Sequence, residues 1–292
     1  MYYLLYGLMY LVSLLPLRVL YILSDGFYFL VYYIIGYRKK VVFQNLDIAF
    51  PQKTEKEKKH IAKGFYHKFI DSLVESVKLL SASDSFFQKR VIGDWHIVDR
   101  YYDQNRSVQI HLGHTFNWEW GNAAFAQNIR YQFLGVFMPI SNKAVDKLFR
   151  KMRGRGGTVL LSAHRMSREF LPYRNALYCL GLVADQSPGT WLQKAKWFTF
   201  FNRKTAFTIG PAKSAIRHDT VVLFASIKRP RRGHYEVNFT VADEHPAMTD
   251  EDTLTKKFVH FLEDTITQNP EMWLWSHRRW KHVWQEGYNT VD

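Results

Sequence analysis

One histidine and one glutamate stand where a short apolar run of the sequence ends. The run from Val108 to Leu112 has the composition of a buried strand and stops at Gly113, and His114 follows at once. Glu119 comes later in the same segment, among large aromatic residues. Histidine is the side chain that most readily takes and returns a proton near neutral pH. The pair therefore predicts general acid–base chemistry at the end of a strand.

Helix geometry limits how these two side chains can meet. Five residues of a helix turn through about 500°, so both side chains in mid-helix would lie roughly 140° apart. They can face each other if His114 lies in the loop and Glu119 lies one turn into the next helix, with Gly113 as a permissive bend. Glu119 is then expected to accept a hydrogen bond from one imidazole nitrogen and leave the other as the base. The helix N-terminus would favour an oxyanion.

These parts suit an acyl transfer in which the acceptor's own hydroxyl attacks the acyl group. Two other interpretations stay open: a structural histidine that caps a loop, and a hydrolase in which His114 activates Ser162 or Ser187. No G-x-S-x-G motif is present for such a serine. A metal site would add His111, but H-x2-H-x4-E is not a standard zinc spacing and His111 alternates with apolar neighbours. No metal is predicted.

Composition and charge narrow the class of protein and of partner. Of 292 residues, 47% are hydrophobic and 16% aromatic, which excludes a disordered chain and allows a substantial core. The formal net charge of +14 favours nucleic acid, acidic lipid headgroups, phosphorylated substrates or an acidic carrier protein. Cys179 is the single cysteine, so it forms no intramolecular disulfide, and its apolar neighbours predict a buried strand.

The N-terminus predicts a membrane anchor. Residues 1–17 carry no charged side chain, and a second apolar run covers 26–37. Each run is short for a perpendicular span of roughly 20 residues, so the anchor over 1–37 is either one long tilted helix or a broken, partly embedded pair. A buried core hairpin is the alternative. The basic residues 38–40 predict that the catalytic domain, 38–292, lies on the cytoplasmic side.

The rest of the chain indicates an α/β fold with a mixed sheet and flanking helices. Thr54 and Glu57 have capping-box spacing, which predicts a helix to about Leu80. A second helix is expected over 250–268. The apolar stripe of the first helix is predicted at Ile61, Phe65, Phe69, Leu73 and Val77. Strands are expected at 107–112, 131–138, 157–161, 176–184 and 219–227, the last in a hairpin with 233–241.

Several ordered segments resemble one family. The sequence G-H-T-F-N-W-E around His114 is similar to the H-x4-D/E signature of the lipid A late acyltransferases. Five further segments resemble motifs of that family: V-V-F-Q-N-L-D-I-A-F-P at 41–51, R-G-R-G-G at 153–157, V-A-D-Q-S-P-G at 183–189, F-T-I-G-P-A-K-S-A at 207–215 and N-P-E-M-W-L-W-S-H-R-R-W-K at 269–281. The resemblance covers nearly the whole chain.

This resemblance implies a glycerolipid-acyltransferase-like fold on the cytoplasmic face of a bacterial inner membrane. It implies transfer of a fatty acyl chain from an acyl carrier protein or acyl-coenzyme A to a hydroxyl of a lipid A precursor or related anionic glycolipid, without a cofactor. Two further functions stay open. One is acylation of another membrane lipid, an aminolipid or phospholipid. The other is a non-catalytic, membrane-attached binder of anionic lipid or nucleic acid, although no nucleic-acid motif is present and no nucleic-acid partner is predicted.

The resemblance also assigns roles to individual residues. His114 matches the family's base and Glu119 its partner. Three further residues match positions that support the site or hold anionic substrate groups: Arg153, Arg155 and Asp185. Asn117, Gln186 and Lys213 are further candidates for contact with substrate. The chain departs from the family's usual pattern at two positions, with Met138 where arginine is frequent and Lys213 where many relatives have glutamate.

The C-terminal aromatic cluster allows two interpretations. Trp273, Trp275, Trp280 and Trp284 lie close together among basic residues at 278–282. Such a mixture is typical of a lipid headgroup interface. The same residues could instead form a segment packed on the sheet with its charges solvated.

Overall fold

The fold is built on a seven-stranded mixed sheet with the order β1-β9-β8-β2-β5-β3-β4. The computed structural model describes residues 1–189, 192 and 195–291. The strands of the sheet are β1 Val91–Gly93, β2 Val108–Leu112, β3 Gln132–Phe137, β4 Val159–Ser162, β5 Tyr178–Val183, β8 Val221–Arg231 and β9 His234–Asp243. The strands β8, β2, β5, β3 and β4 run parallel, and β9 pairs antiparallel with β8.

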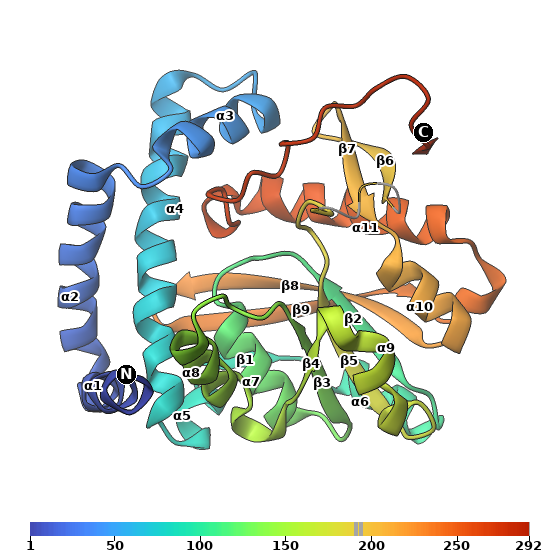
Figure 1. Ribbon diagram of the computed structural model, residues 1–292, viewed down its shortest axis with the longest axis horizontal. Helices are drawn as coiled ribbons and strands as arrows, with labels where there is room; N and C mark the ends of the chain where they lie inside the picture. The colour runs from blue at the N-terminus through green and yellow to red at the C-terminus, as the bar shows by residue number, and fades with distance from the viewer. Residues whose placement is uncertain (190–191, 193–194, 292) are drawn as a thin grey trace.

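Helices cover both faces of this sheet (Figure 1). They include α4 Glu55–Ser76, η2 Val77–Leu80, α5 Asp84–Gln88, α6 His96–Asp103, α7 Trp118–Asn128, α8 Lys143–Arg153, α9 Met166–Glu169, α10 Gly210–His218 and α11 Glu251–Gln268. On one face Phe125 of α7 stacks on Phe133, and on the other Phe258 of α11 packs against Phe224. Because both faces of the sheet are buried, the sequences of its inner strands are continuous apolar runs.

Most predicted elements are confirmed, and the mixed α/β class with them. The five predicted strands and the hairpin correspond to β2, β3, β4, β5, β8 and β9. Cys179 is buried in β5, as expected. Thr54 and Glu57 form the predicted capping box of α4, and α11 matches the predicted second helix. A second sheet was not predicted; it consists of β6 Ala195–Phe200, β7 Arg203–Thr208 and β10 Thr290–Val291.

The predicted apolar stripe of α4 is wrong in its second half. Ile61 and Phe65 are buried, but Leu73 is exposed, and Asp71 and Glu75 are buried instead. A spacing of four residues advances about 400°, so such a stripe drifts about 40° around the helix at each step. By Leu73 the stripe has turned away from the core. The face that is buried there carries carboxylates.

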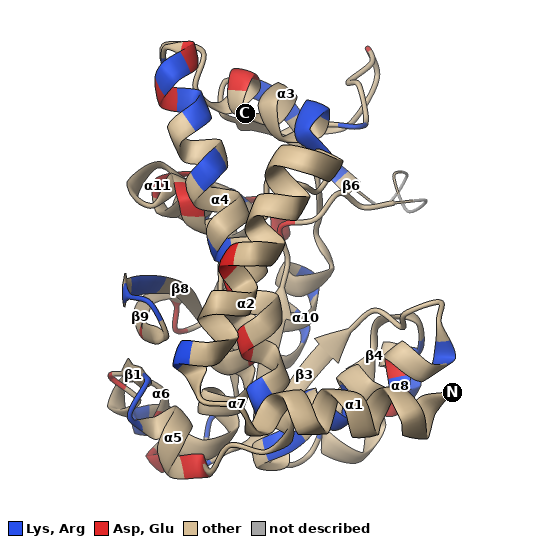
Figure 2. Cartoon of the chain, turned by 90° about the vertical axis from the view of Figure 1, so that its left-hand side faces the viewer, with Lys and Arg blue, Asp and Glu red and all other residues tan. Residues whose placement is uncertain are grey.

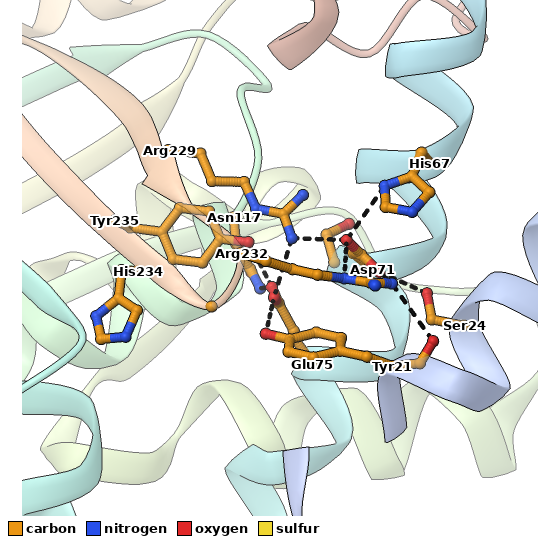
Figure 3. A network of polar contacts seen from close by, with 12 residues as sticks. Tyr21, Ser24, His67, Asp71, Glu75, Asn117, Arg229, Arg232, His234 and Tyr235 are labelled. Carbon is orange, nitrogen blue, oxygen red and sulfur yellow. Dashed lines mark hydrogen bonds and ion pairs between the residues drawn. The ribbon is translucent and has the colours of Figure 1, made fainter. Parts of the chain in front are cut away.

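A buried polar network joins those carboxylates to three other parts of the chain (Figure 3). Arg229 of β8 donates to Asp71 at 2.6 Å, and its side chain is only 5% exposed. Arg232 of the β8–β9 turn donates to both Asp71 oxygens. Glu75 accepts from Asn117 Nδ2 at 3.0 Å and from the hydroxyl of Tyr235.

The second of the two N-terminal helices packs against the same network. The two helices are α1 Tyr2–Leu14 and α2 Leu17–Phe29, and α2 continues as the π-helical stretch η1 Leu30–Ile35. From α2, the Tyr21 hydroxyl donates to Glu75 at 2.8 Å and the Ser24 hydroxyl to Asp71 at 2.6 Å. A broken pair of helices was one of the two predicted forms of the N-terminus. Leu17–Ile35, with a mean hydropathy of 1.4, is long and apolar enough to cross a membrane by length and composition.

The C-terminal segment packs inside the protein. Trp273, Trp275 and Trp280 are buried, so the interpretation of these three as a headgroup interface is wrong. The helix α3, Lys39–Ala49, holds the segment: Asn45 Nδ2 donates to the carbonyls of residues 275 and 277, each at 2.8 Å. The segment follows the short helix η8, Pro270–Met272.

Asp71 is predicted to be essential for stability. Asp71→Ala would leave Arg229 buried without its closest carboxylate, and removing one partner of a buried ion pair typically costs about 3–5 kcal/mol. Urea unfolding of the purified protein in detergent measures the change. The control is Asp103→Ala, whose ion pair with Arg130 is exposed to water and is expected to leave the unfolding midpoint unchanged. Equal midpoints for Asp71→Ala and the parent would contradict the prediction.

Candidate functional site

The imidazole of His114 is held by a buried carboxylate, that of Asp185. His114 Nδ1 lies 2.5 Å from Asp185 Oδ1. The backbone N–H of His114 donates to Asp185 Oδ2 at 2.8 Å, and the indole N–H of Trp273 donates to the same oxygen at 2.6 Å. Three N–H groups therefore meet one carboxylate that is 2% exposed.

These contacts determine the protonation state of the pair. Burial alone would raise the pKa of Asp185, but the charge and hydrogen bonds of His114 and the indole of Trp273 outweigh it and lower the pKa from 3.8 to about 2. The carboxylate is thus ionised at neutral pH and can only accept, so Nδ1 of His114 carries a proton. The ionised Asp185 carboxylate therefore stabilises the folded state fully above pH 3.8, and this stabilisation is lost as the pH falls toward 2.

The second imidazole nitrogen is the one available for proton transfer. His114 Nε2 lies 3.1 Å from Gln186 Nε2, and an amide nitrogen can only donate. Nε2 therefore presents its lone pair, as a general base must. The indole of Trp118 packs edge-on against the imidazole, with ring centroids 5.2 Å apart, and restrains its position.

Two neighbouring parallel strands bring His114 and Asp185 together. Leu112 at the end of β2 pairs with Val183 at the end of β5, and each functional residue follows its strand after one intervening residue. The carboxyl ends of parallel strands share one edge of the sheet, where α/β proteins commonly bind ligands.

Gly113 is required for space rather than for a special bend. Its φ does not lie in the left-handed region, so the expected role as a permissive hinge is wrong. A Cβ atom there would lie 2.6 Å from Leu262 Cδ1 and 3.3 Å from Asp185 Oδ2. The absent side chain therefore allows α11 and the Asp185 carboxylate to approach His114.

Glu119 does not contact the imidazole, contrary to the expectation from H-x4-E. It lies in the first turn of α7 and forms a bidentate ion pair with Arg153 at the end of α8, with Nη2 to Oε1 at 2.6 Å and Nε to Oε2 at 2.9 Å. The indole N–H of Trp118 also donates to Oε1 at 3.1 Å. The indole of Trp118 therefore contacts both the Glu119 carboxylate and the imidazole of His114.

The other expected site residues are distributed more widely. Asn117 caps α7 by accepting from the N–H of Trp120 and donates to Glu75, so both ends of its buried amide are engaged. Arg155 donates to the carbonyl of Leu79 at 3.1 Å and so holds the end of η2. Lys213 lies on α10, where its Nζ is 3.6 Å from a carboxylate oxygen of Glu251 on α11. These contacts place the three side chains within the fold.

Sequence reasoning missed several residues around the imidazole. The sequence predicts for Trp273 and Arg279 either a headgroup interface or a segment packed on the sheet, but no contact with the imidazole, and it gives His277 no role. Arg279 is 1% exposed, lies 4.1 Å from the ring centroid of Phe207, and none of its guanidinium nitrogens has a hydrogen-bond partner in the described part of the chain. Burial lowers its pKa to about 9, while the charge of Asp185 acts in the opposite direction.

The charge of Asp185 also acts on His277. Burial lowers the pKa of His277 to about 4, Asp185 raises it, and Arg279 and His114 lower it. His277 is therefore neutral near pH 7. The family-like motif at 269–281 was the available signal, but the spacing of its residues did not reveal which of them face inward.

His111 and the metal-like cluster lie outside this arrangement. His111 is buried in β2, where its Nε2 lies 3.1 Å from Gln109 Oε1, and burial lowers its pKa to about 3. Asp25, His67 and Asp71 could offer metal ligands within 4.8 Å of one another. The guanidinium of Arg232, however, already donates to both of these aspartates. A cation from the chain itself occupies that cluster.

Comparison with known proteins agrees with this chemistry. Residues 1–282 match the family described as bacterial lipid A biosynthesis acyltransferase. The chain is also 24% identical over 281 residues to the lipid A biosynthesis lauroyltransferase of Escherichia coli K12, covering 94% of this chain and 89% of that protein. The match runs across the strand ends that carry His114 and Asp185. The chain therefore belongs to the bacterial lipid A biosynthesis acyltransferase family and is an acyltransferase.

Proposed function

We propose that this acyltransferase moves a fatty acyl chain from an acyl-thioester donor to a hydroxyl of a lipid A precursor or a related membrane glycolipid. The observation that carries the proposal is the His114–Asp185 contact, which engages Nδ1 and leaves Nε2 of the imidazole available. The name of the E. coli relative supports lipid A biosynthesis as the setting. The acceptor is the lipid, and the donor is acyl carrier protein or acyl-coenzyme A.

The reaction can proceed without a covalent enzyme intermediate. The acceptor hydroxyl replaces Gln186 beside His114 Nε2 and gives up its proton as its oxygen bonds to the thioester carbonyl carbon. Asp185 stabilises the imidazolium that forms. The carbon–sulfur bond then breaks, and the leaving thiolate takes the proton back from Nε2. The start of α7 at Trp118 and the amide of Gln186 favour negative charge on the carbonyl oxygen.

The remaining assignments are part of the same proposal. Residues 1–37 form the membrane anchor, and 38–292 form a catalytic domain of glycerolipid-acyltransferase type on the cytoplasmic face of the inner membrane. The 16 exposed large apolar side chains between Met1 and Ile35, together with Tyr37, support attachment to lipid. Arg153 acts by holding Glu119 rather than by docking substrate.

His114→Ala is predicted to abolish most acyl transfer. Loss of a general base typically costs about 10²–10⁴ in rate. The rate is measured as transfer of label from a labelled acyl donor to purified lipid A precursor. Mass spectrometry of the lipid product identifies the acyl chain added. His164→Ala, at an exposed histidine of a short surface helix, serves as the control. Parental rates for His114→Ala, or an accumulating acyl-enzyme, would exclude direct transfer. Transfer to a phospholipid or aminolipid but not to lipid A precursor would identify a different acceptor.

Asp185 and Glu119 are predicted to differ in importance. Asp185→Asn keeps the shape but removes the charge that stabilises the imidazolium, so kcat is expected to fall by about 10² or more. Glu119→Gln leaves the His114–Asp185 contact in place and is expected to cost less. Steady-state kinetics of both variants measure the two losses in kcat. The reverse order, with Glu119→Gln the more damaging, would mean that Glu119 is the imidazole's partner during turnover.

Gly113→Ala is predicted to reduce kcat in a folded protein. The new Cβ would press on Leu262 and crowd Asp185, and a displacement of about 1 Å near reacting groups can cost about 10²-fold in rate. Adding Leu262→Ala should restore part of the activity by making room. Gly210→Ala is the control, because a Cβ there meets nothing within 4 Å. Full activity of the single Gly113→Ala variant would show that the close approach does not matter.

A further inference from the structure

The two N-terminal helices lie in one plane on the outside of the protein. Figure 1 shows α2 lengthwise along α4 and α1 end-on beneath it. After a turn of 90°, Figure 2 shows both helices lengthwise, with α1 running crosswise to α2. The chain changes direction at Leu15 and Pro16, where Leu15 is extended at φ −60° and ψ 142°. Helices that lie crosswise in one plane cannot both follow the normal of a bilayer.

The outer face of this pair is apolar. Leu4 on α1 is 81% exposed, Ile22 on α2 71% and Ile34 on η1 66%. Residues 1–35 contain two charged side chains, Arg18 and Asp25. Asp25 has an exposed side chain, but its charge is paired, because it accepts from Arg232 at 2.6 Å. A continuous apolar surface of this extent marks a lipid or protein contact.

The inner face of α2 is attached to α4 along its length. In addition to the Tyr21–Glu75 and Ser24–Asp71 hydrogen bonds, Tyr32 of η1 packs on Tyr66 with ring centroids 5.2 Å apart. A bilayer that surrounded α2 and η1 from end to end would therefore also surround α4. That helix carries Lys59, Lys63, His67 and Lys68, and each charged side chain at a bilayer centre costs about 2.5–3.5 kcal/mol on insertion scales.

Basic side chains lie at the rim of the apolar surface. Lys147 and Lys151 of α8 lie 4.4 Å and 4.5 Å from the ring centroids of Tyr2 and Tyr6 on α1. Lys39 lies 4.0 Å from the ring centroid of Tyr32. Lysines and tyrosines in this arrangement suit the headgroup level of an anionic membrane, with the apolar side chains beneath it.

We propose that α1, α2 and η1 lie flat in one leaflet as a monotopic platform and that no helix of residues 1–37 crosses the membrane. This inference rests on the membrane attachment included in the proposed function and specifies its geometry. The occupant of the apolar surface is a lipid leaflet, because the lysines and tyrosines at its rim suit lipid headgroups. A second copy of this chain would bring identical rims of positive charge together.

Depth measurements in vesicles test the geometry. A nitroxide label is placed on single cysteines introduced at Leu4, Ile22 or Ile34 in full-length protein carrying Cys179→Ala, in vesicles of phosphatidylethanolamine and phosphatidylglycerol. Ile22 and Ile34 are separated by about 18 Å along a helix. A flat platform predicts that all three labels lie at one shallow depth, within about one helical turn. A depth difference near 18 Å between Ile22 and Ile34 would overturn the proposal.

Labelling in cells provides the second arm. Single cysteines at Leu14 and Ile35 lie near the two ends of the α2–η1 stretch, and Lys56→Cys is the control on the exposed side of α4. A membrane-impermeant maleimide is expected to miss all three in intact spheroplasts and to reach Lys56→Cys after lysis. Labelling of either end before lysis would show a crossing helix.

The outcomes separate this inference from the proposed function. Neither labelling experiment depends on acyl transfer, so an inactive protein that labels as a flat platform would refute the chemistry alone. Active protein with a crossing helix would refute the platform alone. Recovery of the full chain as a soluble dimer without lipid would refute membrane attachment and identify a second copy as the partner.

Discussion

A carboxylate that is 2% exposed and accepts three N–H groups orders the region around His114. Asp185 would be costly to bury alone, because a charge removed from water loses several kcal/mol of hydration. Asp185 and its partners come from three separate segments: the loop after β5 carries Asp185, the loop after β2 carries His114, and the C-terminal segment carries Trp273. The same interaction therefore stabilises the site and chooses the imidazole tautomer. A substitution that moves any of the three segments would therefore also move the imidazole of His114.

The helix α4 connects the outer surface to the loop that follows β2. Glu75 accepts from Tyr21 on one side and from Asn117 on the other, and Asn117 caps the helix that carries Trp118 and Glu119. Burial raises the pKa of Glu75, although Arg229 and the surrounding donors act the other way. The buried polar residues of α4 thus join the apolar outer surface to Asn117, the N-cap of α7, near His114.

A second connection runs through α8. Its lysines contact the tyrosines of α1, and Arg153 at its end binds Glu119. Helices at the outer surface and side chains next to His114 are therefore linked by two independent routes. Under the proposed function, the helices that meet the membrane would also position His114.

The sequence by itself determined most of the elements and indicated His114 as the candidate base. Apolar runs, the Thr54–Glu57 capping box and the hairpin around Gly233, where φ is 73°, depend on neighbouring residues, so local patterns predicted them correctly. The family-like motifs also drew attention to Asp185 and Gln186. Tertiary structure decided which carboxylate meets the imidazole. Strand order placed Asp185 beside His114 and left Glu119 to Arg153, and no sequence spacing encodes which strands become neighbours. The burial of Asp71, Glu75 and Arg279 was likewise decided by packing, because charged side chains in a sequence are normally expected at the surface.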